Sequence, residues 1–312
     1  LLPVLTMSWF LHRSLRFALP VLMLLALVEF ALRRIPNNYA YIDDQLLDHG
    51  DSVEVLILGN SHAYNGVNPT QLGYRGFNAA HPSQDHRLDH LLLKRYIDHL
   101  PHLKAIVLST SYASIGKQMD QDKESWRLKN YVIYMGQYGQ GRAAKDHLEL
   151  LNGRASDLLR SIHGNWFHGR NNLTVQPWGG VLGKTRDNVD FELDGIKAAD
   201  RHHARSPLTF ATSLKELEAI VRIAKQHRTP VLMFAPPGHS LYRRHLHATQ
   251  LALSQRIPRG LASPSDRIMY VDLLADPRFD TDDFSDADHL NAAGNRKLTS
   301  IIASKLDSIL RQ

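Results

Sequence analysis

The feature that most constrains this chain is a continuous apolar run, Val55–Leu58, that ends abruptly in Gly59. A run without polar alternation suits a strand buried on both faces of a parallel sheet. Asn60, Ser61 and His62 follow directly, where such a strand would turn toward a helix. Open α/β sheets place their chemistry at the carboxyl ends of the strands, and the N–H groups of a following helix favour a developing negative charge there. Ser61 is therefore the candidate nucleophile.

Later stretches of the chain repeat this strand pattern between helical segments. Three further apolar runs predict buried strands, at 104–109, 230–235 and 267–273. Apolar residues at helical spacing separate the runs, and the last such stretch, 298–310, carries an amphipathic stripe that should close the domain. Alternating strands and helices predict an α/β fold with a doubly wound parallel sheet and right-handed crossovers.

Two stretches do not fit this alternation. Residues 35–52 are polar and are interpreted as a linker onto a domain that spans 53–312. Between about 163 and 206, aromatic residues, paired glycines and paired histidines occur without a clear period. A stretch this long inside an α/β domain is typical of a functional insertion or lid, and a disordered loop is the alternative.

The N-terminal part predicts a membrane anchor at 9–34. Residues 17–28 are all apolar, and arginines flank them on both sides. The segment has the roughly 17–25 residues that a spanning helix needs, and its lack of a polar face disfavours a buried core helix. A cleaved signal peptide is the alternative, but no small-x-small site precedes Arg33. We expect an uncleaved signal anchor that crosses the inner (cytoplasmic) membrane once, with the domain on the periplasmic side.

Net charge and cysteine content limit the classes of partner and metal site that the chain can have. The net charge of +6 and the pI near 9.4 favour an anionic partner, such as an acidic polymer or lipid head groups. No Lys/Arg-rich run with interleaved aromatic residues occurs, so we expect no nucleic acid partner. The absence of cysteine excludes disulfides and thiolate metal sites.

A turn before the last helix supplies the residues that a serine nucleophile needs. His289 follows Asp286 by three residues, a spacing at which the carboxylate can orient the imidazole. We assign His289 as the general base and Asp286 as the orienting acid; Asp288 is the alternative, although an adjacent residue would usually point elsewhere. Two competing interpretations remain. Ser61 could be a helix N-cap, or Asp283 could form a metal site with Asp286, Asp288 and His289. We expect neither a metal nor a cofactor.

Two motifs resemble a known family: Gly59-Asn60-Ser61-His62 after the first strand, and Asp286-Ala287-Asp288-His289-Leu290-Asn291 with Gly294 before the last helix. Together they resemble the SGNH (GDSL-like) hydrolase superfamily, over roughly residues 50–312. The resemblance implies a flavodoxin-like three-layer α/β/α domain with a Ser-His-Asp triad. A standard α/β-hydrolase is disfavoured, because Ala63 stands where its Gly-x-Ser-x-Gly elbow requires glycine.

The family's oxyanion donors are matched poorly. Its second block usually contains a glycine, and here Gly76, Asn78 or Ser83 could serve. Its third block usually contains an asparagine, but the strand ending at 109 is followed by Thr110 and Ser111. Their hydroxyl groups are the expected substitutes, and losing one such donor can cost on the order of 100- to 1000-fold in rate.

These departures, together with an anchor, look like the envelope branch of the superfamily. Similar proteins act in teichoic-acid D-alanylation and in exopolysaccharide O-acetylation. The resemblance implies an acyl donor, a polysaccharide or polyol acceptor, and a membrane-bound O-acyltransferase as partner. Candidate substrate-binding residues are His62, Tyr112, His239 and Tyr242. For the last two, a simple strand stop and helix start is the stronger interpretation.

The sequence therefore predicts a membrane-anchored serine esterase or O-acyltransferase. A non-catalytic envelope module that binds a polymer or supports an acyltransferase is the alternative, favoured by the missing third-block asparagine. A lipid esterase is the third possibility, and the polar character of 163–206 disfavours it, since such enzymes carry apolar lids.

Overall fold

The computed structural model describes residues 2–185, 189–204 and 206–311, with side chains from Trp9 onward. The chain divides into two compact units. The first combines the chain up to Tyr41 with Trp126–Leu173, and the second combines Ile42–Ser125 with the chain from Thr174 onward. The sequence gives no sign of this division, because the two parts of the first unit lie far apart along the chain.

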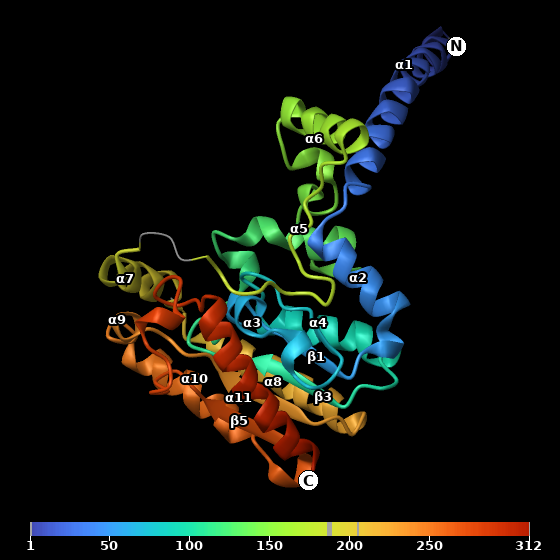
Figure 1. Cartoon of the computed structure of the whole chain (residues 1–312). Helices are drawn as coiled ribbons and strands as arrows, with labels where there is room; N and C mark the ends of the chain where they lie inside the picture. Colours follow the sequence, from blue (N-terminus) through green and yellow to red (C-terminus); the bar gives the residue numbers. More distant parts are fainter. Residues whose placement is uncertain (1, 186–188, 205, 312) are drawn as a thin grey trace. The chain divides into compact units, whose positions relative to one another are not determined.

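The second unit is built on a five-stranded parallel sheet (Figure 1). Its strands are β1 (Val55–Leu58), β2 (Gly76–Asn78), β3 (Ala105–Ser109), β4 (Val231–Ala235) and β5 (Ile268–Asp272). The strand order β2-β1-β3-β4-β5 is the flavodoxin-like doubly wound arrangement. The predicted α/β fold class is confirmed. The short strand β2 was not predicted, since its three residues carry no period of their own and pair through the backbone with β1.

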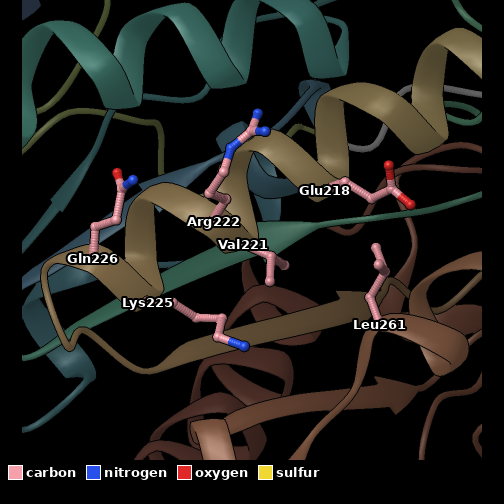
Figure 2. A pocket seen from close by; sticks show the side chains of 6 residues that line it. All are labelled: Glu218, Val221, Arg222, Lys225, Gln226 and Leu261. Carbon is pink, nitrogen blue, oxygen red and sulfur yellow. The ribbon is translucent and has the colours of Figure 1, made fainter.

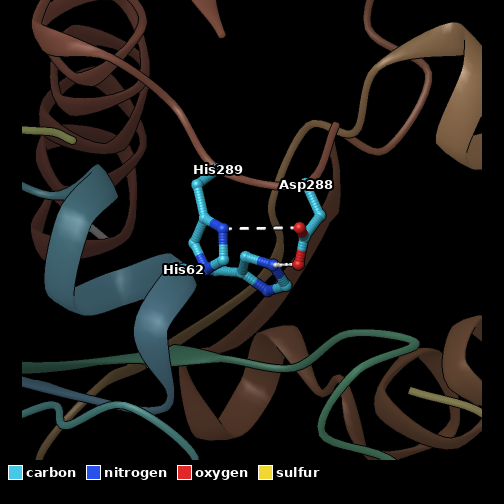
Figure 3. A group of neighbouring side chains, drawn as sticks. All are labelled: His62, Asp288 and His289. Atoms are coloured by element: carbon cyan, nitrogen blue, oxygen red, sulfur yellow. Dashed lines mark hydrogen bonds and ion pairs between the residues drawn. The ribbon is translucent and has the colours of Figure 1, made fainter. Parts of the chain in front are cut away.

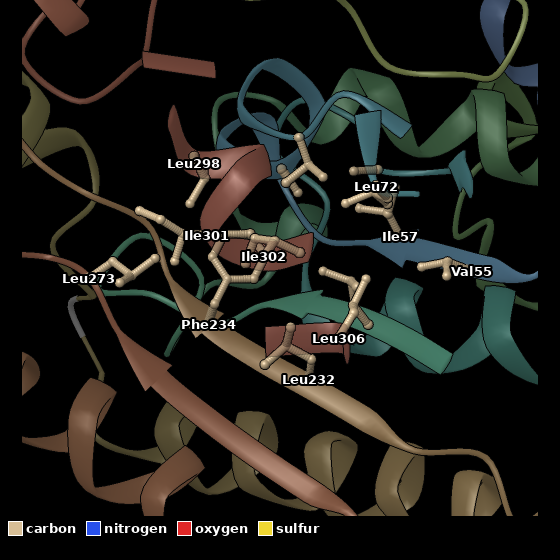
Figure 4. Packing of buried hydrophobic residues seen from close by; sticks show 14 of the residues in the cluster. Val55, Ile57, Leu72, Leu232, Phe234, Leu273, Leu298, Ile301, Ile302 and Leu306 are labelled. Atoms are coloured by element: carbon tan, nitrogen blue, oxygen red, sulfur yellow. The ribbon is translucent and has the colours of Figure 1, made fainter. Parts of the chain in front are cut away.

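Helices of the second unit cover both faces of the sheet: α3 (Ser61–Gly66), α4 (His86–Tyr96), α7 (Phe191–Arg201), α8 (Leu208–Gln226), α9 (Ser240–Arg243), α10 (Ala248–Leu261) and α11 (Ala292–Leu310). Figure 4 shows α11 on one side of the strands and helices coloured as α8 and α10 on the other. All residues of β1, β3 and β4 are buried, as their unbroken apolar runs require.

The core between α11 and the sheet follows from the alternation of side chains along the strands. Val55 and Ile57 of β1 pack in one cluster with Phe234 of β4 and with Ile302 and Leu306 of α11. These residues are spaced by two along the strand and by four along the helix, so each element presents a single apolar face. Fully burying a side chain of this size contributes about 1.5–3 kcal/mol.

The turn after β1 requires a glycine. Gly59 adopts φ +130°, and a Cβ atom there would lie 2.7 Å from the Cβ atom of Ser109. The backbones of β1 and β3 therefore remain close beyond their last paired residues, Leu58 and Leu108. This close approach fixes where α3 begins, at the carboxyl edge of the sheet.

The first unit contains a long apolar helix. Its helices are α1 (Leu2–Arg33), the start of α2 (Asn38–Asp48), α5 (Leu128–Tyr134) and α6 (Ala155–His168). The 25 residues Trp9–Arg33, with a mean hydropathy of 2.1, are long and apolar enough to span a membrane, and no other helix in the described ranges meets that criterion.

Both stretches that lacked a clear pattern contain helices. The range 35–52 contains α2, whose Ile42 and Leu46 are buried and stand four residues apart. The range 163–206 contains the end of α6 and the whole of α7, which Asp190 caps by accepting from the N–H groups of Glu192 and Leu193. Helix α7 is only 11 residues long and buries glycine and alanine, so its apolar period is weak in the sequence.

Candidate active site

Ser61 is the first residue of α3, at the carboxyl edge of the sheet. The turn through Gly59 brings the chain out of β1, and Asn60 caps the helix by accepting from the backbone N–H of His62 at 3.1 Å. Ser61 itself is half-buried. The N-cap interpretation of Ser61 is wrong, because Asn60 occupies the cap and leaves the Ser61 hydroxyl to other partners.

The turn that follows η10 (Thr281–Asp283) places an imidazole against this hydroxyl. His289 Nε2 lies 2.9 Å from Ser61 Oγ. On the other side of the ring, Nδ1 lies 2.9 and 3.1 Å from the two carboxylate oxygens of Asp286. The same carboxylate accepts from the backbone N–H of His289 at 2.7 Å, so one side chain both shapes the turn and orients the ring. The structure thus brings together all three predicted triad residues.

A second carboxylate, Asp288, also faces His289, as Figure 3 shows. Its Oδ1 lies 3.4 Å from His289 Nδ1, although an adjacent residue was expected to point elsewhere. The side chain is fully buried and accepts from Nε2 of His62 at 3.2 Å, from Nε2 of His202 at 2.8 Å and from Arg201 at 3.2 Å. Because an ionised carboxylate only accepts, both histidines donate from Nε2. The sequence prediction missed this role for Asp288.

Burial and the neighbouring charges give the three imidazoles of this cluster different pKa values. Burial lowers the pKa of His202 to about 4 and also lowers that of His62, although the hydrogen bonds to Asp288 act in the opposite direction. Burial also disfavours the charged form of His289, but the charge of Asp288 and the hydrogen bond that His289 donates to Asp286 outweigh it and raise the pKa of His289 to about 10. The carboxylates thus favour the charged form of His289, whereas burial favours the neutral forms of His62 and His202.

Four residues from before α8 hold this turn in place: Lys184, Asp194, Arg201 and His202. Lys184 Nζ donates to Asp286 Oδ2 at 2.5 Å, and Asp194 accepts from the backbone N–H of Ala287 at 2.8 Å. Arg201 and His202 hold Asp288. The prediction of a functional insertion here gave no roles to these residues, and the only signal was the group of charged residues and paired histidines in an otherwise irregular stretch.

The oxyanion candidates lie at both ends of the sheet. Gly76 pairs with Val55 at the amino end of β1, so its prediction as an oxyanion donor is wrong. Asn78 is also wrong as a donor, because its side-chain N–H groups are directed to the carbonyl oxygens of Ala63 and Val67, both at 3.0 Å. The asparagine instead ties α3 to β2.

Three candidates remain at or near the carboxyl edge. Ser83 lies in the loop after β2, with φ +66°. The Ser111 hydroxyl lies 3.5 Å from that of Ser114 within its own turn. The Thr110 hydroxyl is buried and has no hydrogen-bond partner among the residues that the structure describes. A buried unpaired hydroxyl is costly, so among these three predicted candidates Thr110 is the one whose hydroxyl is best suited to donate to a bound group.

All four predicted substrate-binding side chains are buried, and their contacts are structural. His62 donates to Asp288, and the Tyr112 hydroxyl accepts from the His247 N–H at 3.2 Å. His239 caps α9 and contacts Thr281 at 3.0 Å through Nε2. Tyr242 packs with Tyr112 in a small cluster beneath α7. Their role in substrate binding stays a prediction, and α7, whose position the sequence did not reveal, contributes Ala198 and Ala199 to the cluster around Tyr112 and Tyr242.

Side chains around the triad also include combinations that could hold a metal ion. Among the residues that the structure describes, two groups of three side chains bring possible ligand atoms within 4.8 Å of one another: His62, Asp288 and His289, and Asp194, Asp286 and Asp288. In the first group the ligand atoms already hydrogen-bond to one another through Asp288. In the second, Asp286 holds His289 and Asp194 holds a backbone N–H. Each proposed ligand thus has a partner within the protein.

A separate surface hollow of about 490 Å³ lies beside α8 (Figure 2). It is lined by Glu218, Val221, Arg222, Lys225, Gln226 and Leu261. None of these residues comes from the segments that hold Ser61 or His289. The hollow carries none of the chemistry described above.

Comparison with known proteins gave no match to a family model and no match among curated sequences. Among solved structures, a provisionally assigned platelet activating factor from Streptococcus pneumonia aligns with a TM-score of 0.42 at 13% identity, over 93% of this chain and 99% of that one. A provisionally assigned acylhydrolase from Bacteroides fragilis NCTC 9343 aligns with a TM-score of 0.42 at 10% identity, over 88% and 100%. Similarity at this level carries no argument about function.

Proposed function

We propose that the chain is a membrane-anchored serine acyl-transfer enzyme of the SGNH type. The observation that carries the proposal is the contact chain from Ser61 Oγ to His289 Nε2 at 2.9 Å and from His289 Nδ1 to Asp286 at 2.9 Å. A nucleophile, a base and an orienting carboxylate within hydrogen-bond reach of one another are the defining geometry of serine acyl transfer.

The proposed reaction proceeds in two halves. His289, once neutral, takes the Ser61 proton at Nε2 while Ser61 Oγ attacks the carbonyl carbon of the acyl donor. The tetrahedral intermediate collapses when the imidazolium returns the proton to the leaving group, and an acyl-Ser61 ester remains. An acceptor hydroxyl, or water, then attacks this ester with His289 again as the base, and the bond from the acyl carbon to Ser61 Oγ breaks as His289 returns the proton to Ser61. Asp286 and Asp288 stabilise the imidazolium in both halves.

Oxyanion stabilisation is assigned to backbone and hydroxyl donors. We propose the backbone N–H of Ser61 as one donor, because it stands at the start of α3. The Thr110 hydroxyl is the second, at the position where the resembled family has asparagine. A hydroxyl donates one hydrogen bond and can rotate to follow the developing charge.

The proposed setting is the outer side of the cytoplasmic membrane, on an envelope or exported polysaccharide. An apolar helix that can span a membrane supports the anchoring. The net charge of +6 fits an acidic polymer or an anionic membrane surface. A membrane-bound O-acyltransferase is the proposed partner that supplies the acyl group.

A non-catalytic module is the second candidate, and one observation favours it. At neutral pH the raised pKa leaves His289 protonated, so its Nε2 donates to Ser61 and cannot accept a proton. Under this alternative, the ion cluster would serve only to hold the turn. The two candidates differ in whether a neutral His289 at alkaline pH activates Ser61.

The test is turnover of a chromogenic acetate ester by the full chain in detergent at alkaline pH, where His289 is neutral, with and without a soluble polysaccharide acceptor. We expect ester consumption that Ser61→Ala abolishes and that Ser285→Ala preserves, since the Ser285 hydroxyl only bonds the His289 carbonyl within the turn, at 3.3 Å. Acetylated acceptor identifies a transferase, and free acetate alone identifies an esterase. Equal activity in wild type and Ser61→Ala would refute the proposal.

A further inference from the structure

Helix α6 of the first unit carries an apolar face that the rest of this unit covers only in part. Its residues Leu158, Leu159, Ile162 and Trp166 recur at helical spacing, so they share one side of the helix. Leu159 is 57% exposed, Trp166 57% and Phe167 75%. Only Gly164 of the whole helix is buried. A 14-residue helix with so little burial is not held by protein packing alone.

A contact of Glu29 fixes residues 149–150, which precede α6, near the end of the apolar helix α1. Glu29 lies one turn before the end of α1, and Arg33 donates to its carboxylate at 2.6 Å. The same carboxylate accepts from the backbone N–H groups of Glu149 and Leu150, at 3.1 and 2.8 Å. A carboxylate at the edge of a membrane is tolerated when it is paired in this way. Residues 149–150 are therefore fixed at the level where α1 would leave the hydrocarbon.

Helix α6 begins five residues after Leu150 and packs against α1. Its apolar face is thus held at the same end of the spanning helix. The stretch 126–173 contains seven lysines and arginines against three aspartates and glutamates, which complements an anionic lipid surface. Tryptophan beside basic residues is the composition of helices at the boundary between head groups and acyl chains.

We propose that α6 is an interfacial helix, which lies in the outer surface of the membrane that α1 crosses and buries Leu159 and Trp166 among the lipids. The proposal rests on α1 spanning a membrane and is independent of the serine chemistry. The apolar face of α6 binds the lipid surface itself. The first unit then has two attachments to the bilayer, one across it and one along it.

The native chain has no cysteine, so single cysteines report depth without further engineering. Leu159→Cys and Asp157→Cys form a matched pair, because both side chains are exposed but lie on opposite sides of α6. Leu22→Cys, in the exposed apolar part of α1, reports the spanning segment. Each full-length variant is labelled with an environment-sensitive dye and reconstituted into vesicles of phosphatidylethanolamine and phosphatidylglycerol, with quenchers attached to lipids or dissolved in water.

We expect the label at 159 to show blue-shifted emission and quenching by the lipid-attached quencher, and the label at 157 to be quenched from water. Labels at 159 and 157 that are equally exposed to water, while the label at 22 is embedded, would overturn the proposal and point to a protein that covers α6. A label at 22 that is not embedded would overturn it as well, by removing the membrane from α1. Neither result bears on Ser61, which the ester assay tests separately.

Discussion

Replacement of Asp288 by asparagine tests how the buried carboxylate controls the base. Its Oδ1 lies 3.4 Å from His289 Nδ1. Two unit charges at that distance interact by roughly 5 kcal/mol at an effective dielectric constant of about 20. Since 1.36 kcal/mol corresponds to one pH unit, the upper bound is roughly 3.5 units, and a single neighbouring charge usually shifts a pKa by about 1–3 units. Asp288→Asn should therefore lower the pKa of His289 by about 1–3 units.

The rate should respond differently in two ranges of pH. The wild-type rate rises with pH until His289 is neutral, through a midpoint near its pKa of about 10. In Asp288→Asn the midpoint moves down by about 1–3 units, and the alkaline plateau falls by up to about 10- to 1000-fold, because the transition-state imidazolium loses its partner. At neutral pH the two rates differ little, since resting enzyme and transition state then carry the same charge.

The assay is the rate of Ser61 modification by a fluorophosphonate across a pH series, followed by intact mass. Asp283→Asn is the matched control: Asp283 is buried in the same region but bonds Lys297 and the Asp280 N–H. An unchanged midpoint in Asp288→Asn, or an equal displacement in Asp283→Asn, would refute the reasoning. Melting temperatures of both variants show whether the turn remains folded.

Three further outcomes are expected. Thr110→Val should lower the turnover number by about 100- to 1000-fold without loss of stability, whereas Ser109→Ala, which also removes a buried hydroxyl without a described partner, should leave it unchanged; equal effects in the ester assay would contradict the oxyanion role of Thr110. The stability that charged His289 provides is complete below pH 6.5 and is lost as the pH rises through about 10, so in thermal melts the difference between wild type and His289→Gln should shrink across that window; a constant difference would oppose it. Leu306→Ala should cost about 2–5 kcal/mol in chemical denaturation, and the exposed Ser304→Ala less than about 0.5 kcal/mol; similar costs would contradict the assigned core.

Strands β1, β3 and β4 could be predicted because each is a buried apolar run that the local sequence defines, and β5 was found in the same way although only Ile268 of it is fully buried. The runs 104–109, 230–235 and 267–273 end within one residue of β3, β4 and β5. Strand β2 could not be found in this way, since Gly76–Asn78 is only three residues long and depends on its pairing with β1. The sequence pattern thus predicts strands that carry their own apolar run, and it misses a strand that forms only through pairing with its neighbour.

The same distinction applies to the candidate site. Asp286 and His289 stand three residues apart, so a local motif could propose their contact. The bond from Lys184 to Asp286 joins residues 102 positions apart, and no spacing rule predicts it. His202 and Arg201 stand in a stretch without period, where only the folded chain shows that they hold Asp288. The burial of Tyr112 was not predicted, because tyrosine occurs both at surfaces and in cores.

The central claim is that His289 activates Ser61 as a nucleophile. The most direct measurement is the intact mass of the full chain after fluorophosphonate treatment at alkaline pH, where His289 is neutral, with peptide mapping of the adduct. We predict one adduct, on Ser61, that is absent from Ser61→Ala and from His289→Gln and present in Ser285→Ala. A folded wild-type chain that stays unmodified at every pH, or an adduct that persists in His289→Gln, would contradict the account.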